Sequence, residues 1–406
     1  MVNVIGLGYI GLPTALMLAA NGADVYGTDC NKSVVENLKK GKITFEERGL
    51  EELLGKANRN ITFGIEYKAA EFYIITVPTP YDVLTKKIDV KYVLKAVEDV
   101  LAVAPRGAIV IIESTISPGT IDKCLRPLIY EKYGMEIGTD IHLVHAPERI
   151  IPGNMVYELA NNARTIGADD TAIGNKVKDL YSIFCCGEII VTDIKTAEMT
   201  KVIENTYRDI NIAFANELAK ICNIDGMDVY EIIRIANKHP RVNILQPGPG
   251  VGGHCISVDP WFIVGDHPLS ANMIYMARKI NDSMPEYVLQ RIYDIMQANS
   301  IGGASRVGIY GLAYKEDVDD CRESPTLQLL DNMKRHLSMP IKVYDPMIKY
   351  SIVDNQYFDF EKFVADIDML VVMVGHKHLL NNIESIRDKI IYDTRNIVKL
   401  ENVYKL

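Results

Sequence analysis

Short apolar segments alternate with amphipathic stretches over most of this 406-residue chain. Residues 2–5 form an apolar run that predicts a strand, and residues 12–21 follow with helix-forming composition and apolar side chains on one face. A second strand is expected over residues 24–28. Strand, helix and strand in this order predict a βαβ unit at the amino terminus.

The same pattern continues along the chain in two blocks. Apolar runs predict further strands of the first block at residues 72–77, 108–113 and 142–145. The second block has strands at residues 306–311, 341–344, 368–374 and 390–393, and a helix at residues 324–335. Pro325 suits the first turn of that helix. Two doubly wound α/β sheets are therefore expected.

The middle of the chain is helical. Residues 195–222 lack Gly and Pro and are expected to form one long helix, with Thr196 as a candidate cap. Residues 273–299 form a second helical stretch that is expected to pack beside the first. The predicted fold is α/β, with two Rossmann-like doubly wound domains joined by a central helical domain. Paired long helices of this kind offer a dimerisation surface.

Composition and charge narrow the class of protein. Hydrophobic residues make up 48% and charged residues 24%, as in soluble globular proteins. The net charge of −9 argues against nucleic acid or an anionic membrane as the main partner. Apolar runs are far shorter than the ~20 residues of a membrane helix, and the amino terminus lacks a basic leader, so a cytoplasmic protein is expected. Seven scattered cysteines without a CxxC pair predict neither disulfides nor a metal site.

A glycine-rich turn follows the first predicted strand. Gly6, Gly8 and Gly11 form GxGxxG between a strand and a helix, which is the dinucleotide-binding arrangement. Gly6 would make the tight turn, Gly8 would let the backbone approach the pyrophosphate, and Gly11 would let helix and strand pack closely. The N–H groups at the helix start favour phosphate. A glycine-rich turn in an unrelated α/β protein is the alternative.

Asp29 ends the second predicted strand, 18 residues after Gly11. A carboxylate there is placed to bind both hydroxyls of the adenosine ribose and would repel a 2′-phosphate, so NAD is favoured. Lys32 nearby leaves NADP open. Thr79 and Thr115 follow the next two predicted strands, at the sheet edge where α/β proteins bind ligands. They are candidate cofactor contacts or ordinary turn hydroxyls.

Polar residues lie on one face of the long central helix. Lys201, Asn205 and Arg208 stand at i, i+4 and i+7. A solvated helix face is one interpretation of this stripe and a functional face is the other, which the poor helix propensity of asparagine favours. His239 and Arg241 come shortly before a glycine-rich loop.

That loop, at residues 248–262, reads GPGVGGHCISVDPWF and holds His254, Cys255 and Asp259. A thiol near a nicotinamide indicates an aldehyde that is trapped as a thiohemiacetal, oxidised to a thioester and hydrolysed to an acid. The glycines would let the sugar carbon approach the sulfur, and the helical lysine and asparagine would stabilise the oxyanion. Asp259 would hold or activate the hydrolytic water.

The turn after the first strand of the second block lacks a full GxGxxG. Such a turn suits a mononucleotide better than a dinucleotide. Lys315 and Arg322 follow this strand and are placed to neutralise a diphosphate.

The chain carries seven motifs in this order: GLGYIG, VPTP, STISPGT, APERIIPG, KVIENTYRDINIAFANE, GPGVGGHCISVDPWF and GLAYKEDVDDCRESP. Together they resemble the UDP-sugar 6-dehydrogenases of the UDP-glucose/GDP-mannose dehydrogenase family over almost the whole chain. The resemblance implies two successive NAD-dependent oxidations of a sugar C6 alcohol to a carboxylate. It also implies three domains, placed at residues 1–194, 195–299 and 300–406, and a homodimer formed through the central helices.

The resemblance also assigns roles to residues. Cys255 matches the family nucleophile, Lys201 matches the catalytic lysine, and Asn205 and Asp259 match its supporting polar groups. The residues at NAD positions are Tyr9, Ile10, Asp29, Thr79 and Thr115, beside the three glycines of the first turn. The residues at UDP-sugar positions are Arg149, Ile150, Lys201, Asn205, Arg208, His239, Arg241, Gly252, Tyr314, Lys315 and Arg322. In this family the segment with His239 and Arg241 is a candidate for reaching the neighbouring subunit's substrate.

Within the family, GHCISVDPWF together with KHPRVNIL is most similar to the enzymes that oxidise UDP-N-acetyl-D-mannosamine. That sugar nucleotide is the expected substrate, with UDP-N-acetylglucosamine and UDP-glucose as alternatives. A two-electron dehydrogenase of the β-hydroxyacid type is another alternative and would not need Cys255. A regulatory protein that senses NAD without turnover is a third. For Cys255 alone, the alternative is a small buried residue.

Overall fold

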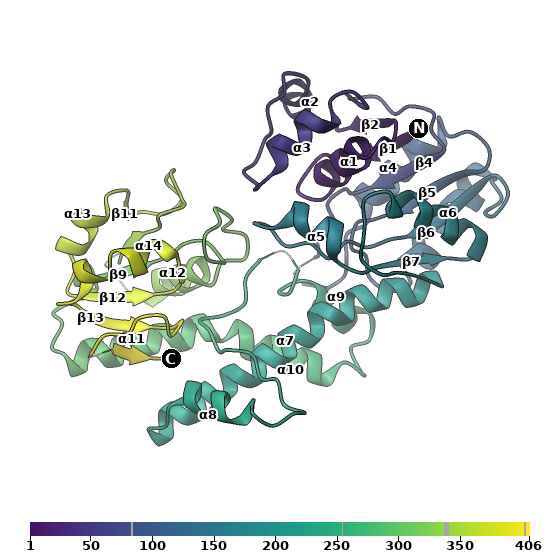
Figure 1. Ribbon diagram of the computed structural model, residues 1–406. Helices are drawn as coiled ribbons and strands as arrows, with labels where there is room; N and C mark the ends of the chain where they lie inside the picture. Colours follow the sequence, from purple (N-terminus) through teal and green to yellow (C-terminus); the bar gives the residue numbers. More distant parts are fainter. Residues whose placement is uncertain (83, 254, 337–340, 402) are drawn as a thin grey trace. The chain divides into compact units, whose positions relative to one another are not determined.

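The computed structural model describes residues 1–82, 84–253, 255–336, 341–401 and 403–406, with the backbone alone at residues 335 and 336 (Figure 1). His254 of the glycine-rich loop lies outside the described residues. The chain forms two compact units, Met1–Glu204 and Asn205–Leu406. Within the described ranges, no helix combines the length and the apolar composition that crossing a membrane requires.

The first unit is built on an eight-stranded sheet. Six of its strands follow the order β3-β2-β1-β4-β5-β6 and pair in parallel, which is the doubly wound arrangement. β7 pairs antiparallel with β6, and β8 pairs parallel with β7. The strands are β1 (Val2–Ile5), β2 (Val25–Thr28), β3 (Ile61–Gly64), β4 (Phe72–Ile75), β5 (Ala108–Ile112), β6 (Ile141–His145), β7 (Arg164–Ala168) and β8 (Ile189–Thr192).

Two hydrophobic clusters form the core of this unit. One gathers around α1 (Gly11–Ala20), which is buried at nine of its ten positions, and the other around α4 (Lys91–Leu101). The predicted βαβ unit is confirmed as β1, α1 and β2. The remaining helices are α2 (Lys32–Lys39), α3 (Leu50–Ala57), α5 (Met155–Asn161) and α6 (Thr171–Ser182), with short π-helical segments η1 (Ile121–Leu125) and η2 (Leu128–Lys132).

One helix of 32 residues, α7 (Ile194–Asp225), spans the division between the two units and confirms the predicted long central helix. Asp193 caps it: Oδ1 accepts the backbone N–H of Thr196 at 2.9 Å, and Oδ2 accepts the Thr196 hydroxyl at 2.6 Å. The prediction that Thr196 is the cap was wrong, because this residue already lies in the first turn. The three domain ranges given above stay a prediction.

The second predicted helical stretch consists of two helices, α10 (Asn272–Asp282) and α11 (Met284–Ala298), rather than one. The break falls where it does because Pro285 lacks an N–H group and would clash with a helical carbonyl four residues earlier, whereas the first turn of a new helix accepts it. Two shorter helices, α8 (Val229–Ala236) and α9 (Asp259–Asp266), complete this part of the chain.

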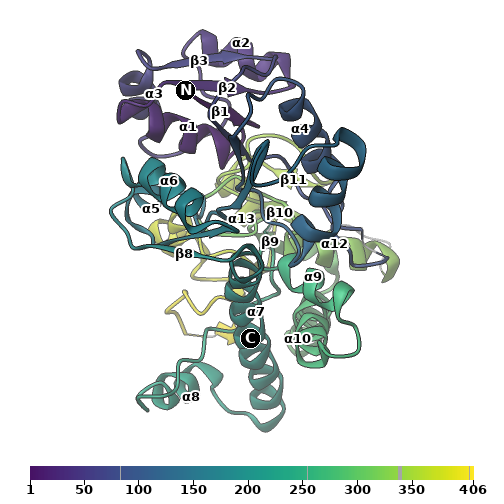
Figure 2. The same ribbon diagram turned by 90° about the vertical axis from the view of Figure 1, so that its right-hand side faces the viewer.

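In the second unit α10 lies beside α7, as Figures 1 and 2 show. Arg278 of α10 is 2.5 Å from the buried carboxylate of Asp209 in α7. Asn281 donates to Asp209 and accepts from Asn216. Burial raises the pKa of Asp209 to about 6, although Arg278 acts in the opposite direction. Because a buried ion pair is costly to break, these contacts hold α10 in one register against α7.

The carboxy-terminal sheet has six parallel strands in the order β11-β10-β9-β12-β13-β14, which repeats the doubly wound order of the first unit. The predicted fold of two Rossmann-like sheets with a helical segment between them is thereby confirmed. The strands are β9 (Val307–Tyr310), β10 (Lys342–Tyr344), β11 (Gln356–Tyr357), β12 (Met369–Val372), β13 (Ile390–Asp393) and β14 (Val403–Lys405). The helices are α12 (Pro325–His336), α13 (Phe360–Ala365), α14 (Lys377–Asn381), η3 (Ala304–Arg306) and η4 (Ile383–Ile386).

Candidate functional site

The turn between β1 and α1 needs Gly6 and Gly11 for the reasons expected, whereas the role of Gly8 toward a pyrophosphate stays a prediction. Gly6 has φ +89°, the left-handed region. A Cβ atom on Gly11 would lie 1.9 Å from the carbonyl oxygen of Gly6, so only glycine allows the helix to start this close to the strand. Gly8 is exposed, and a Cβ atom there would meet open space. Next to it, the half-buried Tyr9 ring lies 4.4 Å from the ring of Phe45.

Asp29 follows β2 and is oriented by two backbone groups. Its Oδ2 accepts the N–H of Leu7 at 2.8 Å, and its Oδ1 accepts the N–H of Asn31 at 2.8 Å. The side chain is half-buried, and an ionised carboxylate has about four lone-pair sites, so it can also accept from ribose hydroxyls. Lys32 is exposed at the start of α2.

Thr79 and Thr115 are half-buried in the loops after β4 and β5. These loops are joined, because the Ser114 hydroxyl donates to the carbonyl oxygen of Val77 at 2.7 Å. The second loop is also tied to α7, where the buried Glu198 accepts the N–H groups of Gly119 and Ile121. Glu198 looked like an ordinary helical acid in the sequence.

The segment after β6 lies over a buried charge cluster that no sequence pattern indicated. Arg164 on β7 is 3.0 Å from Glu113 Oε1 and also pairs with Glu148. Its guanidinium lies 4.4 Å from the centre of the Tyr181 ring. Burial raises the pKa of Glu113 to about 7, with Arg164 acting in the opposite direction. The cluster fixes the end of β5 to the segment that carries Glu148 and Arg149.

Arg149 itself is held by the protein. Its guanidinium donates to Glu204 at 2.8 Å, to the Ala163 carbonyl oxygen at 2.7 Å and to the Thr165 hydroxyl at 2.8 Å. Its neighbour Ile150 is buried. The expected UDP-sugar role of these two residues stays a prediction.

His145, at the end of β6, is a buried neutral imidazole. Its Nδ1 bonds to the carbonyl oxygen of Ile112 at 2.9 Å, and its Nε2 has no hydrogen-bond partner among the described residues. Burial lowers the pKa of His145 to about 3, and the charge of Lys201 contributes to the shift. Lys201 is itself only 7% exposed, so this part of the polar stripe is not a solvated face.

The second unit brings Asn205 and Asp259 together. Asn205 Nδ2 donates to Asp259 Oδ2 at 2.7 Å, and both side chains are buried. The N–H of Asp259 donates to the carbonyl oxygen of Cys255 at 2.8 Å, which fixes the start of α9. The Cys255 residue is exposed, so the alternative of a small buried cysteine was wrong.

The glycines before Cys255 pack against protein. A Cβ atom on Gly252 would lie 2.7 Å from the carbonyl oxygen of Glu323, and one on Gly253 would lie 2.8 Å from Tyr314. Gly253 also donates its N–H to the carbonyl oxygen of Arg322 at 3.0 Å. Packing against the 311–323 loop therefore requires these glycines, and their expected role in admitting the sugar stays a prediction.

The other predicted substrate residues differ in their surroundings. Tyr314 and Lys315 are half-buried, whereas Arg322 is exposed and pairs with Asp320 at 2.6 Å. Burial raises the pKa of Tyr314 to about 12. Arg208, His239 and Arg241 are exposed residues of α7 and of the segment after α8. The 311–323 loop thus gathers three of the predicted residues, with Gly252 packed against it.

Known proteins match the chain along its length. Residues 1–185 match the NAD binding domain of the UDP-glucose/GDP-mannose dehydrogenase family, residues 195–283 match its central domain and residues 308–400 match its UDP binding domain. The UDP-N-acetyl-D-mannosamine dehydrogenase of Methanococcus vannielii is 42% identical over 415 residues, covering 99% of this chain and 94% of that protein.

Two further relatives extend this picture. The NDP-N-acetyl-D-galactosaminuronic acid dehydrogenase of Ralstonia nicotianae is 38% identical, covering 98% of this chain and 96% of that protein. The solved structure of a UDP-D-ManNAc dehydrogenase from Pyrococcus horikoshii has a TM-score of 0.92 and 35% identity, covering 100% of this chain and 99% of that one. The similarity therefore extends over both compact units.

The buried His145 predicts a loss of stability in mild acid. The unfolded chain binds a proton on this residue below pH 6.5, whereas the folded protein does so only near pH 3, so the free energy of unfolding falls as the pH drops below 6.5. Between pH 7 and pH 5.5, wild type should lose about 1 kcal/mol more than His145→Gln in urea unfolding. His142→Gln, on the same strand, should behave as wild type. Equal losses for His145→Gln and wild type would contradict the prediction.

Proposed function

The chain belongs to the UDP-glucose/GDP-mannose dehydrogenase family and is an NAD-dependent UDP-sugar dehydrogenase, and from this premise we propose that it oxidises UDP-N-acetyl-D-mannosamine. The product is the uronate, formed by a four-electron oxidation at C6. The names of the Methanococcus and Pyrococcus relatives support this choice of sugar. The observation that carries the chemistry is the exposed Cys255, four residues before the buried Asp259–Asn205 pair.

The proposed reaction has a covalent intermediate on the protein. The C6 alcohol loses a proton and a hydride and becomes an aldehyde, to which the Cys255 thiolate adds as the nucleophile. The thiohemiacetal loses its hydroxyl proton and a second hydride and becomes a thioester, which water cleaves to the carboxylate and the free thiol. NAD, when bound at the β1–α1 turn, supplies the hydride acceptor for both oxidations.

In this proposal, buried polar groups on α7 stabilise the negative charge that develops on the substrate oxygen. Lys201 and Asn205 donate to the oxyanion, and donors of this kind are worth about 3 kcal/mol each. The 2.7 Å bond to Asp259 orients the Asn205 amide. An amide nitrogen carries two N–H groups, and we propose that the second one donates to the substrate oxygen. Asp259 is proposed to hold or activate the water that hydrolyses the thioester.

The nucleotide part of the substrate is proposed to bind at the carboxyl ends of β9 and β12. These strands are neighbours at the point where the strand order reverses, which is where doubly wound sheets bind ligands. Lys315 and Arg322, on the loop after β9, carry the positive charges that a diphosphate requires. Tyr314 keeps its proton at neutral pH, because its pKa is about 12, and can donate a hydrogen bond.

A subunit interface is part of the proposal. Tyr207, Phe214 and Ile221 recur every seven residues along α7 and are 61%, 49% and 47% exposed. Residues at this spacing share one helix face. These exposed apolar side chains along one face of α7 support a homodimer formed through the central helices, with the partner being a second copy of the chain.

Substrate and stoichiometry can be tested in one assay of NAD reduction. UDP-N-acetyl-D-mannosamine should be oxidised with a higher kcat/KM than UDP-N-acetylglucosamine or UDP-glucose. Each molecule of sugar nucleotide consumed should yield two molecules of NADH. One NADH per sugar would instead indicate the two-electron dehydrogenase. Binding of both ligands without NADH formation would indicate the NAD-sensing regulator.

Replacing the thiol should stop the reaction before the acid. Cys255→Ser should bind the UDP-sugar with unchanged affinity but lower uronate formation by at least about 1,000-fold, because the hydroxyl is a far weaker nucleophile. Cys186→Ser, which alters another exposed cysteine in the first unit, is the matched control and should keep full turnover. Complete four-electron turnover by Cys255→Ser, measured by product analysis, would exclude the thioester route.

The proposed dimer predicts a concentration-dependent mass. Phe214→Ser combined with Ile221→Ser should weaken self-association by at least about 100-fold in analytical ultracentrifugation, because each buried apolar side chain contributes about 1.5–3 kcal/mol. Tyr130→Ser, on η2 of the first unit, removes an aromatic that is 71% exposed and should leave the mass unchanged. A wild-type protein that stays monomeric at micromolar concentration would refute this interface.

A further inference from the structure

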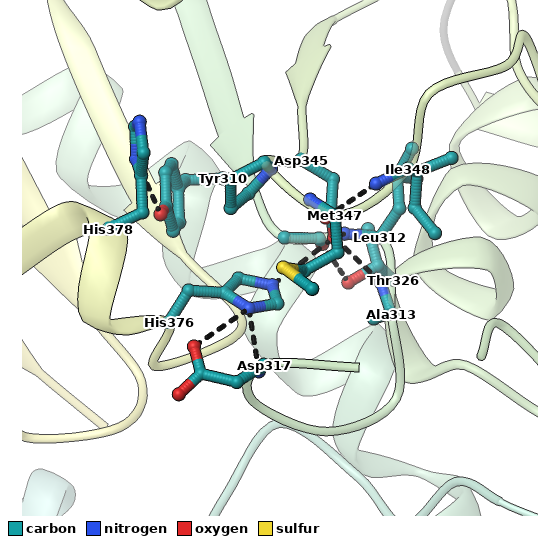
Figure 3. A network of polar contacts seen from close by, with 12 residues as sticks. Tyr310, Leu312, Ala313, Asp317, Thr326, Asp345, Met347, Ile348, His376 and His378 are labelled. Carbon is teal, nitrogen blue, oxygen red and sulfur yellow. Dashed lines mark hydrogen bonds and ion pairs between the residues drawn. The ribbon is translucent and has the colours of Figure 1, made fainter. Parts of the chain in front are cut away.

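A buried imidazole connects three loops of the second unit, as Figure 3 shows. His376 is fully buried between Asp345, at the end of β10, and Asp317 in the 311–323 loop. Its Nε2 lies 3.3 Å from Asp345 Oδ2, and its Nδ1 accepts the backbone N–H of Asp317 at 2.9 Å. Because Nδ1 accepts, Nε2 carries the N–H that is donated to the carboxylate.

Asp345, which His376 contacts, is itself held by four backbone N–H groups. Its Oδ2 also accepts the N–H groups of Leu312 and Ala313 at 2.6 and 2.9 Å. Its Oδ1 accepts those of Met347 and Ile348 at 2.7 and 3.3 Å. Burial alone would raise the pKa of Asp345, but the bonds from His376 and the backbone outweigh it and hold the pKa below its usual value. The carboxylate is therefore a rigid anionic anchor.

Asp317 is restrained by groups outside its own loop. It has φ +57°, in the left-handed region that few non-glycine residues adopt. Its N–H is taken by His376, and its Oδ1 accepts the N–H of Lys377 at 3.2 Å. Both restraints come from the segment that follows β12. The conformation of the loop after β9 thus depends on that segment.

The restrained loop is the one that carries Tyr314, Lys315 and Arg322. It also reaches the catalytic thiol loop, because the Arg322 carbonyl oxygen accepts the N–H of Gly253. His376 itself is 0% exposed, so it cannot contact a ligand. His376 follows the carboxyl end of β12, and the 311–323 loop follows β9. These two strands are neighbours at the point where the strand order of the sheet reverses.

We infer that His376 is a positioning residue for the UDP moiety: by accepting the Asp317 N–H, it sets the 311–323 loop in the conformation that binds the diphosphate. This inference rests on the proposed function, which places the nucleotide at that loop. The hydrogen bond from His376 Nε2 to Asp345 contributes less to this positioning, because four backbone N–H groups already bond to the Asp345 carboxylate.

Two amide substitutions separate the two bonds of the imidazole. Asparagine places its Oδ1 near the position of Nδ1 and keeps an acceptor for Asp317, whereas glutamine reaches the position of Nε2 and keeps a donor for Asp345. His376→Gln should raise the Kd for UDP, measured by calorimetry, by about tenfold, since it leaves a buried N–H unsatisfied. His376→Asn should stay within about threefold of wild type.

His378→Asn is the matched control. His378 lies in α14, two residues after His376, and its Nδ1 is 3.2 Å from the hydroxyl of Tyr310, so this variant should leave the Kd for UDP unchanged. Thermal denaturation of each variant confirms that it is folded. If His376→Gln binds UDP as wild type does, or if both His376 variants lose affinity equally, the positioning role is overturned. If wild type itself does not bind UDP, the nucleotide site of the proposed function fails, and the inference fails with it.

Discussion

Both Rossmann-like sheets depend on one constraint, a carboxylate at the end of the second strand that fixes the turn after the first. Asp29 accepts the N–H of Leu7, and Asp345 accepts those of Leu312 and Ala313. A buried N–H group without an acceptor costs about 1–3 kcal/mol, so the acid decides which turn conformation is stable. The two turns are thus built alike, and the difference between them lies in how much of each carboxylate remains for a ligand.

The two carboxylates differ in how many of their lone pairs are already used by the protein. Asp29 is half-buried and accepts from two backbone groups, so lone pairs remain for further donors, such as the ribose hydroxyls of the predicted NAD site. Asp345 is buried, and its oxygens accept from four backbone N–H groups and from His376. In the proposed function, the second sheet therefore binds its nucleotide through side chains of the following loop. A turn without a full GxGxxG, followed by cations, is what such a site requires.

The sequence allowed the features that depend on local pattern to be predicted. The strands named in the sequence analysis, the long helix and the close approach of Gly11 to Gly6 follow from periodicity and backbone sterics over a few residues. Strands β3, β7, β8, β11 and β14 were not predicted. Two predictions about helix ends were wrong for local reasons. Asp193, and not Thr196, accepts the hydrogen bonds at the start of α7, and Pro285 divides the second helical stretch into two helices. The buried clusters could not be predicted in this way. Their partners stand 51 residues apart for Arg164 and Glu113, 79 for Gly119 and Glu198, and 59 for Asp317 and His376.

The glycines before Cys255 show a close approach that the sequence indicates without identifying the approaching group. Absent side chains do indicate a close approach, but only tertiary structure reveals that the approaching group is Tyr314. A Cβ atom on Gly252 or Gly253 would push the thiol loop away from the 311–323 loop, whose Arg322 carbonyl oxygen holds the Gly253 N–H. The two loops therefore behave as one packed body. In the proposed function, a ligand that orders the 311–323 loop also orders the segment that carries Cys255, so binding of the UDP moiety and positioning of the proposed nucleophile are coupled.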